Sequence, residues 1–164
     1  MKLKILLPVF IILLFSGCKS NEEAVMNLRS ISFTSDITYY NENYSADCII
    51  DSDGNFTALL TQPQSIAGLL LEYVGGECKI KYNGIEIKNS GSMLPANCSV
   101  DVIYNILNDC ENTLHSADNG NIEARGEYGG HKYLLSASPG GLPISLEIPD
   151  MGITVSFKNV SYIK

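Results

Sequence analysis

Basic side chains are scarce in this chain of 164 residues. There are 11 Lys and Arg against 18 Asp and Glu, which gives a formal net charge of -7. A nucleic-acid-binding protein needs a basic surface, and a protein held at a membrane by charge needs a polybasic segment, so both classes are excluded. Hydrophobic residues, at 45%, are too many for a disordered chain. The length predicts one domain.

Motifs of common catalytic and metal sites are also missing. The chain contains neither GxSxG nor HExxH. It has no CxxC pair and two His, at His115 and His131, which excludes a clustered zinc site. We expect His115 to lie in a loop near Asp118, and His131 to open a strand. The sequence therefore predicts no cofactor, no metal and no enzymatic activity.

The longest apolar run lies at the N-terminus and is too short to cross a membrane. Two Lys precede ten residues at 6–15 that are apolar apart from one Pro, whereas a transmembrane helix needs about 20 residues. The run ends in Ser-Gly-Cys, with the Cys at position 18. Small residues before a Cys resemble the bacterial lipobox, in which the thiol is acylated before signal peptidase II cuts on its N-terminal side. We interpret residues 1–17 as a lipoprotein signal peptide; the alternative is an ordinary cleavable signal peptide with Cys18 present by chance.

Lipidation of Cys18 by palmitate-type acyl chains would anchor the mature protein on the extracytoplasmic face of a bacterial cell membrane. Removing residues 1–17 removes two of the 11 basic residues and none of the 18 acidic ones, which leaves a net charge of -9. A chain this acidic is not held at a negatively charged membrane by charge, so the lipid would provide the anchor. Residues 18–29 then form a polar tether, and residues 30–164 a single domain.

From residue 30 onward, apolar residues alternate with period two, which is typical of half-buried β-strands. Asn83-Gly84 predicts a type I′ hairpin turn, because both residues tolerate a positive φ. Residues 41–43 predict another hairpin loop, and 51–55 a tight turn, since the later ligands of an EF-hand loop are missing. The alternation changes parity near Lys158-Asn159, which predicts a β-bulge.

One segment has a helical period instead. It predicts an amphipathic helix at about 99–111, with Ser99 as N-cap. A helix this short is not stable alone, so it must pack on the sheet. The sequence therefore predicts a mainly β (α+β) fold, a curved antiparallel meander of about ten strands that forms an incomplete barrel with one helix on its concave face. The apolar face of the helix contains Val102, Ile103, Ile106, Leu107 and Cys110.

Short segments within this layout resemble a known family. They read QPQSIAGL at 62–69, YNG at 82–84, LP at 94–95 and GLPI at 141–144. Together with the lipobox-like N-terminus, the meander and the helical insert, they are similar to the bacterial lipoprotein-carrier superfamily (LolA/LolB-like) over roughly residues 28–164. The resemblance implies an unclosed barrel whose concave apolar face holds acyl chains.

Four Cys follow Cys18, and disulfides are permitted outside the membrane. In a sequential meander Cys48 and Cys78 would lie three strands apart, about 14 Å. Cys98 and Cys110 would flank the helix, about 18 Å apart. Both separations exceed the limit of about 7 Å for a disulfide. The pairings 48–98 with 78–110 and 48–110 with 78–98 remain, as do four free buried thiols.

Two functions fit this layout. The first is a binding protein that holds a hydrophobic ligand or acyl chain between sheet and helix, because one short helix cannot cover the inner face of about ten strands. The second is a structural or interaction lipoprotein of the cell envelope, or of a spore-related assembly, with a filled core, an envelope protein as partner and no ligand. For the first function, the residues expected to contact the ligand are Leu69, Leu71, Tyr73, Ile103 and Leu107.

Overall fold

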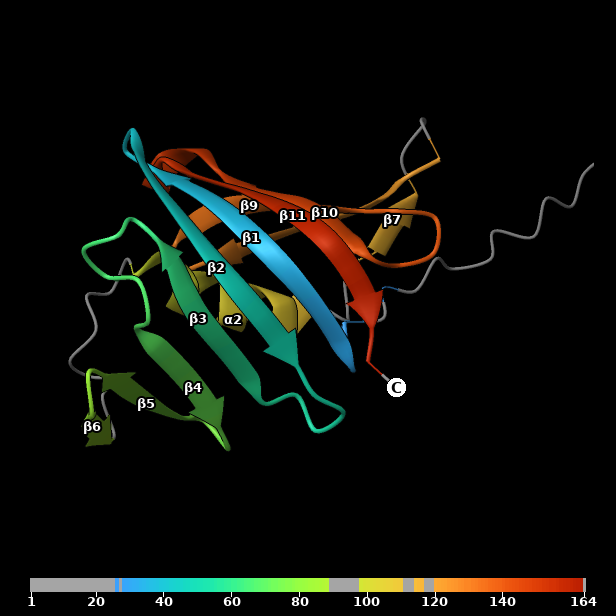
Figure 1. Ribbon diagram of the computed structural model, residues 1–164. Helices are drawn as coiled ribbons and strands as arrows, with labels where there is room; N and C mark the ends of the chain where they lie inside the picture. The colour runs from blue at the N-terminus through green and yellow to red at the C-terminus, as the bar shows by residue number, and fades with distance from the viewer. Residues whose placement is uncertain (1–25, 27, 89–97, 111–113, 117–119, 164) are drawn as a thin grey trace, which may run out of the picture.

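The computed structural model describes residues 26, 28–88, 98–110, 114–116 and 120–163. These residues form eleven strands and one α-helix, which is one strand more than expected. The strands form one antiparallel sheet in the order β6-β5-β4-β3-β2-β1-β11-β10-β9-β8-β7 (Figure 1). The elements are β1 Ile31–Tyr39, β2 Glu42–Ile50, β3 Phe56–Gln62, β4 Leu70–Val74, β5 Glu77–Tyr82, β6 Ile85–Lys88, α2 Ser99–Asp109, β7 Leu114–Ser116, β8 Ile122–Tyr128, β9 His131–Ala137, β10 Pro143–Ile148, the 3-10 helix η3 Pro149–Met151, and β11 Ile153–Tyr162.

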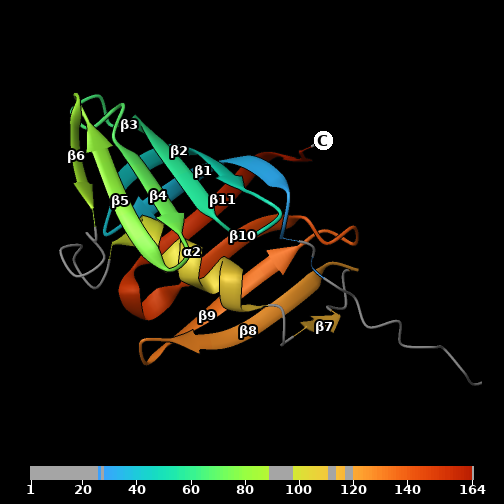
Figure 2. The same cartoon turned by 90° about the horizontal axis from the view of Figure 1, so that it is seen from below.

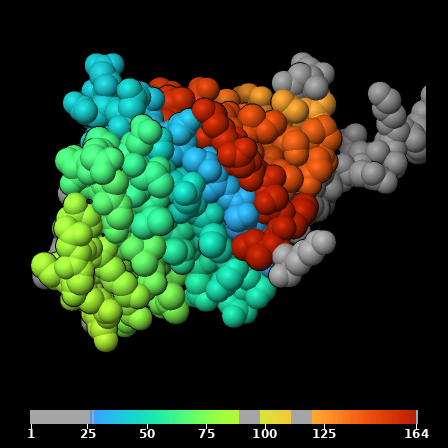
Figure 3. Space-filling model, viewed as in Figure 1, coloured from blue at the N-terminus to red at the C-terminus, as the bar shows by residue number. Residues whose placement is uncertain are grey.

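The sheet curves around α2, which lies on its concave side (Figure 2). Strands β4 and β5 lie on one side of the helix and β8 and β9 on the other. From the opposite, outer face, the strands hide the helix (Figure 3). The edge strands β6 and β7 do not pair with each other, so the described residues form an open sheet rather than a closed barrel. This confirms the predicted mainly β fold.

The first and last strands pair in the middle of the sheet. Ile31 pairs with Tyr162, and Tyr39 with Ile153. Between them the register shifts, because Ser32 pairs with Ser161 whereas Thr34 pairs with Lys158. Strand β11 therefore has one extra residue here, and Asn159 adopts a φ of 52°. The predicted bulge near Lys158-Asn159 is confirmed.

Two-residue turns set the register of the hairpins. Asn83 and Gly84 have φ values of 49° and 81°, as the type I′ prediction requires. The prediction of a hairpin loop at residues 41–43 was wrong about its position. The turn is Tyr40-Asn41, with φ values of 44° and 73°, and β2 already begins at Glu42. A turn with two positive φ values matches the twist of its strands, so pairing continues to the residues beside it.

Helix α2 begins one residue earlier than a Ser99 N-cap would place it. The N-cap is Cys98, whose carbonyl accepts a hydrogen bond from the Val102 amide at 3.0 Å. Tyr104 stacks on Tyr73 of β4 with ring centroids 4.4 Å apart. On the other side, the Asn105 amide donates to the Tyr128 hydroxyl of β8 at 3.2 Å. The helix thus contacts both halves of the curved sheet.

The sheet also contains a close contact at Gly126 of β8. A Cβ on this glycine would lie 2.4 Å from the Tyr133 hydroxyl and 2.5 Å from the adjacent ring carbon. Tyr133 is buried, so its ring must move into its neighbours to admit a methyl group. We expect Gly126→Ala to lower the free energy of unfolding by about 1–3 kcal/mol, measured by urea denaturation. Gly140→Ala is the control, since its nearest contact would be 3.8 Å away, and equal effects would contradict the prediction.

Candidate functional site

An apolar cavity of about 280 Å³ lies between the sheet and the first turn of α2. Small-molecule pockets typically measure about 300–1,000 Å³, so this one is just below the lower end. Among the described residues, no Lys, Arg, Asp or Glu lines it, and the polar side-chain groups of the lining are three hydroxyls and a thiol. The lining residues are Tyr39, Tyr44, Leu60, Ile66, Leu69, Leu71, Ile80, Cys98, Ser99 and Val100.

One wall of the cavity is the connector between β3 and β4. The Leu60 amide donates to the Leu69 carbonyl at 2.9 Å, and the Gly68 amide donates back to the Leu60 carbonyl at 2.8 Å. These bonds close the connector into a loop, in which the Ile66 amide donates to the Pro63 carbonyl at 3.0 Å. Ile66 and Leu69 are therefore held against the core beside the cavity.

The opposite wall is the start of α2. Burial raises the pKa of the Cys98 thiol, although hydrogen bonds from the Asp101 and Val100 amides act in the opposite direction. The thiol therefore stays protonated near neutral pH. This end of the cavity presents neutral groups to a ligand.

The five residues predicted to contact a ligand lie in two places. Leu69 and Leu71 line the cavity. Tyr73, Ile103 and Leu107 do not, since they are packed in the core with 3%, 1% and 2% of their surface exposed. Ile103 and Leu107 belong to the buried face of α2, and Tyr73 is on β4, whereas this cavity lies beside the first turn of the helix.

An aromatic cluster fills the space beneath the middle of the helix. Phe56 lies 5.7 Å from Tyr104 and 5.9 Å from Tyr73, measured between ring centroids. Burial raises the pKa of the Tyr73 hydroxyl well above its ordinary range, and the charge of Asp101 adds to this shift. The hydroxyl therefore stays neutral at any ordinary pH, and the ring serves packing.

Several cavity residues were missed at the level of sequence. One of them, Ile80, could have been found, because a Gly75-Gly76 turn pairs Leu71 with Ile80. Tyr39 and Tyr44 are on neighbouring strands, and the misplaced first turn obscured their register. Nothing in the sequence predicts that the N-terminus of α2 lies beside these strands, because this is a contact between residues far apart in the chain.

The four cysteines that follow position 18 lie among the described residues and form no disulfide. Cys48 on β2 and Cys78 on β5 lie three strands apart, as the meander predicts. Burial raises the pKa of the Cys48 thiol to about 12, so this thiol is not ionised near neutral pH. The two disulfide pairings that the sequence left open, 48–98 with 78–110 and 48–110 with 78–98, are both absent.

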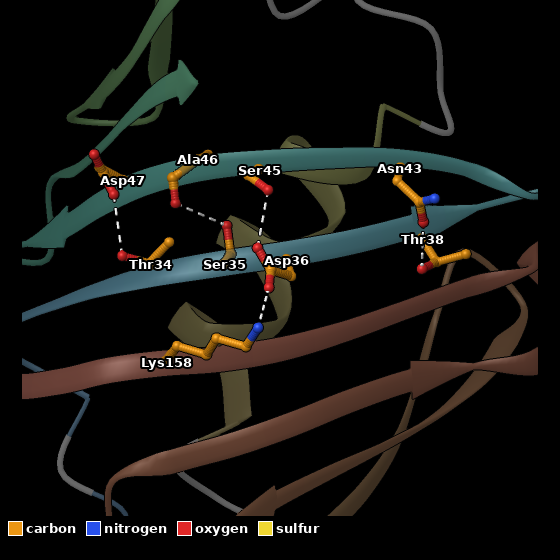
Figure 4. A network of polar contacts seen from close by, with 9 residues as sticks. All are labelled: Thr34, Ser35, Asp36, Thr38, Asn43, Ser45, Ala46, Asp47 and Lys158. Carbon is orange, nitrogen blue, oxygen red and sulfur yellow. Dashed lines mark hydrogen bonds and ion pairs between the residues drawn. The ribbon is translucent and has the colours of Figure 1, made fainter. Parts of the chain in front are cut away.

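A polar network covers the outer face of β1, β2 and β11, away from the cavity (Figure 4). The Asp36 carboxylate accepts hydrogen bonds from Lys158 and, at 2.9 Å, from the Ser45 hydroxyl. The Lys158 hydrogen bond holds the pKa of Asp36 below its ordinary value. Thr34 donates to the Asp47 carboxylate at 3.0 Å. These bonds join neighbouring strands and leave the apolar cavity on the other face.

One of the two His residues lies where the sequence predicted it. His131 opens β9 as predicted. His115 was expected in a loop, but it lies in β7 and pairs with Glu123 of β8. The described residues contain no group of three or more His, Cys, Asp or Glu that could hold a metal ion. Nor do they include a helix long and apolar enough to cross a membrane.

Comparison with known proteins places the fold. No protein-family model matches the chain, and no curated protein matches its sequence. Among solved structures, it is similar to a LolA superfamily protein from Nitrosomonas europaea, with 14% identity, a TM-score of 0.50, and coverage of 87% of this chain and 89% of that one. A DUF1329 family protein from Desulfovibrio piger gives 12% identity, coverage of 80% and 84%, and a TM-score of 0.41. PNGF-II gives 11% identity and a TM-score of 0.40, with coverage of 82% of this chain and 28% of that one.

The likeness to the LolA superfamily protein extends over most of both chains. It agrees with the open antiparallel sheet and the helix on its concave side. The fold is therefore LolA-like, as the resemblance in the sequence implied. At 14% identity the likeness defines the fold alone.

Proposed function

We propose that this protein binds an apolar ligand, such as an acyl chain, in the cavity beside the start of α2. A lipid on Cys18 anchors it on the extracytoplasmic face of the cell membrane. The observation that carries the proposal is the apolar cavity of about 280 Å³, whose lining contains no charged residue in the part of the chain that the structure describes. The lipobox-like Ser-Gly-Cys sequence after a short apolar run supports the anchor. The protein acts in binding rather than catalysis.

The walls of the cavity determine what it selects. Moving apolar surface out of water contributes about 25 cal/mol per Å². The described lining residues offer no charged partner for a headgroup, so a ligand with a charged end leaves that end outside. The small volume restricts the cavity to a short apolar group or to one end of a longer chain.

A structural or interaction lipoprotein of the envelope is the second candidate. It is favoured by the packing beneath the rest of the helix, where Ile103 and Leu107 are almost fully buried. On this view the cavity is a gap in an otherwise filled core, and a partner protein binds elsewhere. Absence of ligand binding in the experiment below would support this candidate.

Filling the cavity tests the binding proposal. We expect Leu69→Trp to weaken binding of N-phenyl-1-naphthylamine, a neutral apolar fluorescent probe, by about tenfold or more, because the indole occupies the probe's space. The measurement is a fluorescence titration of the mature chain carrying Cys18→Ser, which needs no detergent. Mass spectrometry of lipid extracted from the native protein would then identify the natural ligand.

Leu59→Trp is the matched control. Leu59 is on the outer face of β3 with 39% of its surface exposed, so the same substitution leaves the cavity open. Circular dichroism verifies that both variants are folded. Failure of the parent protein to bind the probe, or equal binding by the two variants, would contradict the proposal.

A further inference from the structure

One end of the sheet contains both the entry of the chain into the fold and the end of its last strand. The Ser30 amide donates to the Asp51 carbonyl at 3.3 Å, and the Ser30 carbonyl accepts a hydrogen bond from the Ile163 amide at 2.7 Å. Ile31 pairs with Tyr162. The end of β11 and the loop after β2 accordingly lie at the same end of the molecule (Figure 1).

The tether to this end is short. Met26 and Leu28 are packed into the core, with 3% and 2% of their surface exposed. Met26, the first described residue, comes eight residues after Cys18. Eight residues span at most about 29 Å, which is about the length of the nine-residue strand β1. If Cys18 carries a lipid, Met26 lies within that distance of the bilayer, and Ser30 at the entry end is four residues further along the chain.

Exposed apolar side chains lie at this same end. Tyr162 and Ile163 are 48% and 41% exposed, and Val74, at the end of β4, is 49% exposed. The Tyr162 hydroxyl donates to the Gly140 carbonyl at 3.3 Å. Tyr is favoured at membrane–water interfaces, where its ring meets the headgroup region. Apolar side chains also gain free energy when a bilayer removes them from water.

We infer that the entry end of the sheet rests against the membrane surface, with Tyr162, Ile163 and Val74 in contact with the bilayer. The inference rests on the proposed lipid anchor at Cys18. Asp51 and Asp53 occupy the adjoining loop, and ionised carboxylates do not enter hydrocarbon. The contact is therefore shallow, at the level of the headgroups.

The opposite end provides an internal control. Tyr40 is 63% exposed, which is more than Tyr162. It follows Tyr39, which is eight residues along β1 from Ile31, a distance of about 26 Å. Exposure of a Tyr does not distinguish the two ends. The tether favours the entry end, because a bilayer at the opposite end would require nearly its full extended length.

The chain has no Trp, so a single introduced Trp reports on one position alone. Tyr162→Trp and Tyr40→Trp would be placed separately in the mature lipidated protein, reconstituted in phosphatidylcholine vesicles with brominated acyl chains. Bromine quenches Trp fluorescence on close approach. We expect the Tyr162→Trp protein to lose most of its emission relative to unbrominated vesicles, and the Tyr40→Trp protein to keep its emission.

The outcomes separate this inference from the anchor. If mass spectrometry finds the lipid on Cys18 but the Tyr162→Trp protein is unquenched, the anchor stands and the inference fails. Stronger quenching of the Tyr40→Trp protein also overturns the inference. A protein without the lipid overturns both, because the tether then fixes nothing. Ile163→Trp is a second reporter at the same end if Tyr162→Trp disturbs the fold.

Discussion

Cys18→Ala, combined with a signal peptide that ordinary signal peptidase removes, is expected to move the protein from the membrane fraction to the soluble extracytoplasmic fraction. The replacement signal peptide is needed because signal peptidase II cuts only after the thiol is acylated, so residues 1–17 would otherwise stay attached. A single acyl chain gives reversible membrane binding with a constant of about 10⁴ M⁻¹, and two or more chains make the anchor stable. Without a thiol at position 18 no chain can be attached there. The remaining mature chain carries a net charge of about -9 from its 9 basic and 18 acidic residues, so an anionic bilayer repels it. The loss of membrane binding should therefore be nearly complete.

Cell fractionation and the mass of the mature N-terminus measure this effect. Cys98→Ala is the matched control, because this thiol is at the start of α2 and takes no part in anchoring. It should leave the protein in the membrane fraction. Equal fractionation of the parent and the Cys18→Ala protein, together with an unacylated N-terminus in the parent, would support the ordinary signal peptide and rule out the anchor.

Phe56→Ala is expected to lower the free energy of unfolding by about 3–5 kcal/mol. Phe56 is 1% exposed and lies between the sheet and the helix. Its ring centroid is 6.5 Å from that of Phe33, 5.9 Å from that of Tyr73 and 5.7 Å from that of Tyr104. Removing the ring takes a partner from each of these side chains and leaves a void beneath the helix. Against a total stability of about 5–15 kcal/mol, the loss is large.

Urea denaturation near neutral pH measures this loss. Ile85→Ala is the control, because Ile85 is 66% exposed on the edge strand β6 and should change stability by less than about 0.5 kcal/mol. A loss below about 1 kcal/mol for Phe56→Ala would mean that the three neighbouring rings collapse into the void. The aromatic cluster would then not be what holds α2 on the sheet.

Most turns and strand registers followed from local sequence, although the first hairpin turn is Tyr40-Asn41 and not residues 41–43. Asn83-Gly84 predicts a turn because of the φ values its two residues accept, and such a turn pairs the residues on either side of it. The bulge at Asn159 was visible as a change in parity, since a strand with one buried face must keep its apolar residues on that face. Both properties depend on residues adjacent in the chain.

The other differences between prediction and structure arose where the structure depends on contacts between residues far apart in the chain. Strand β7 is three residues long and exists through its pairing with β8, so its own sequence carries little information. Tyr73, Ile103 and Leu107, three of the five residues expected to contact a ligand, are packed in the core and do not line the cavity. Their apolar character was correctly read, but apolar residues that pack and apolar residues that line a cavity look alike in a sequence.

The amino-acid order alone was sufficient for the antiparallel meander and for the presence of one amphipathic helix, and it predicts the lipid anchor at Cys18. Periodicity and turn chemistry are local, and a hairpin needs no information from elsewhere in the chain. Two features could be identified only in the folded molecule. They are the pairing of β1 with β11 and the packing of α2 over Phe56 and Tyr73. The cavity beside the start of α2 results from this packing. The aromatic side chains fill the space beneath the middle of the helix and leave room at its N-terminal end.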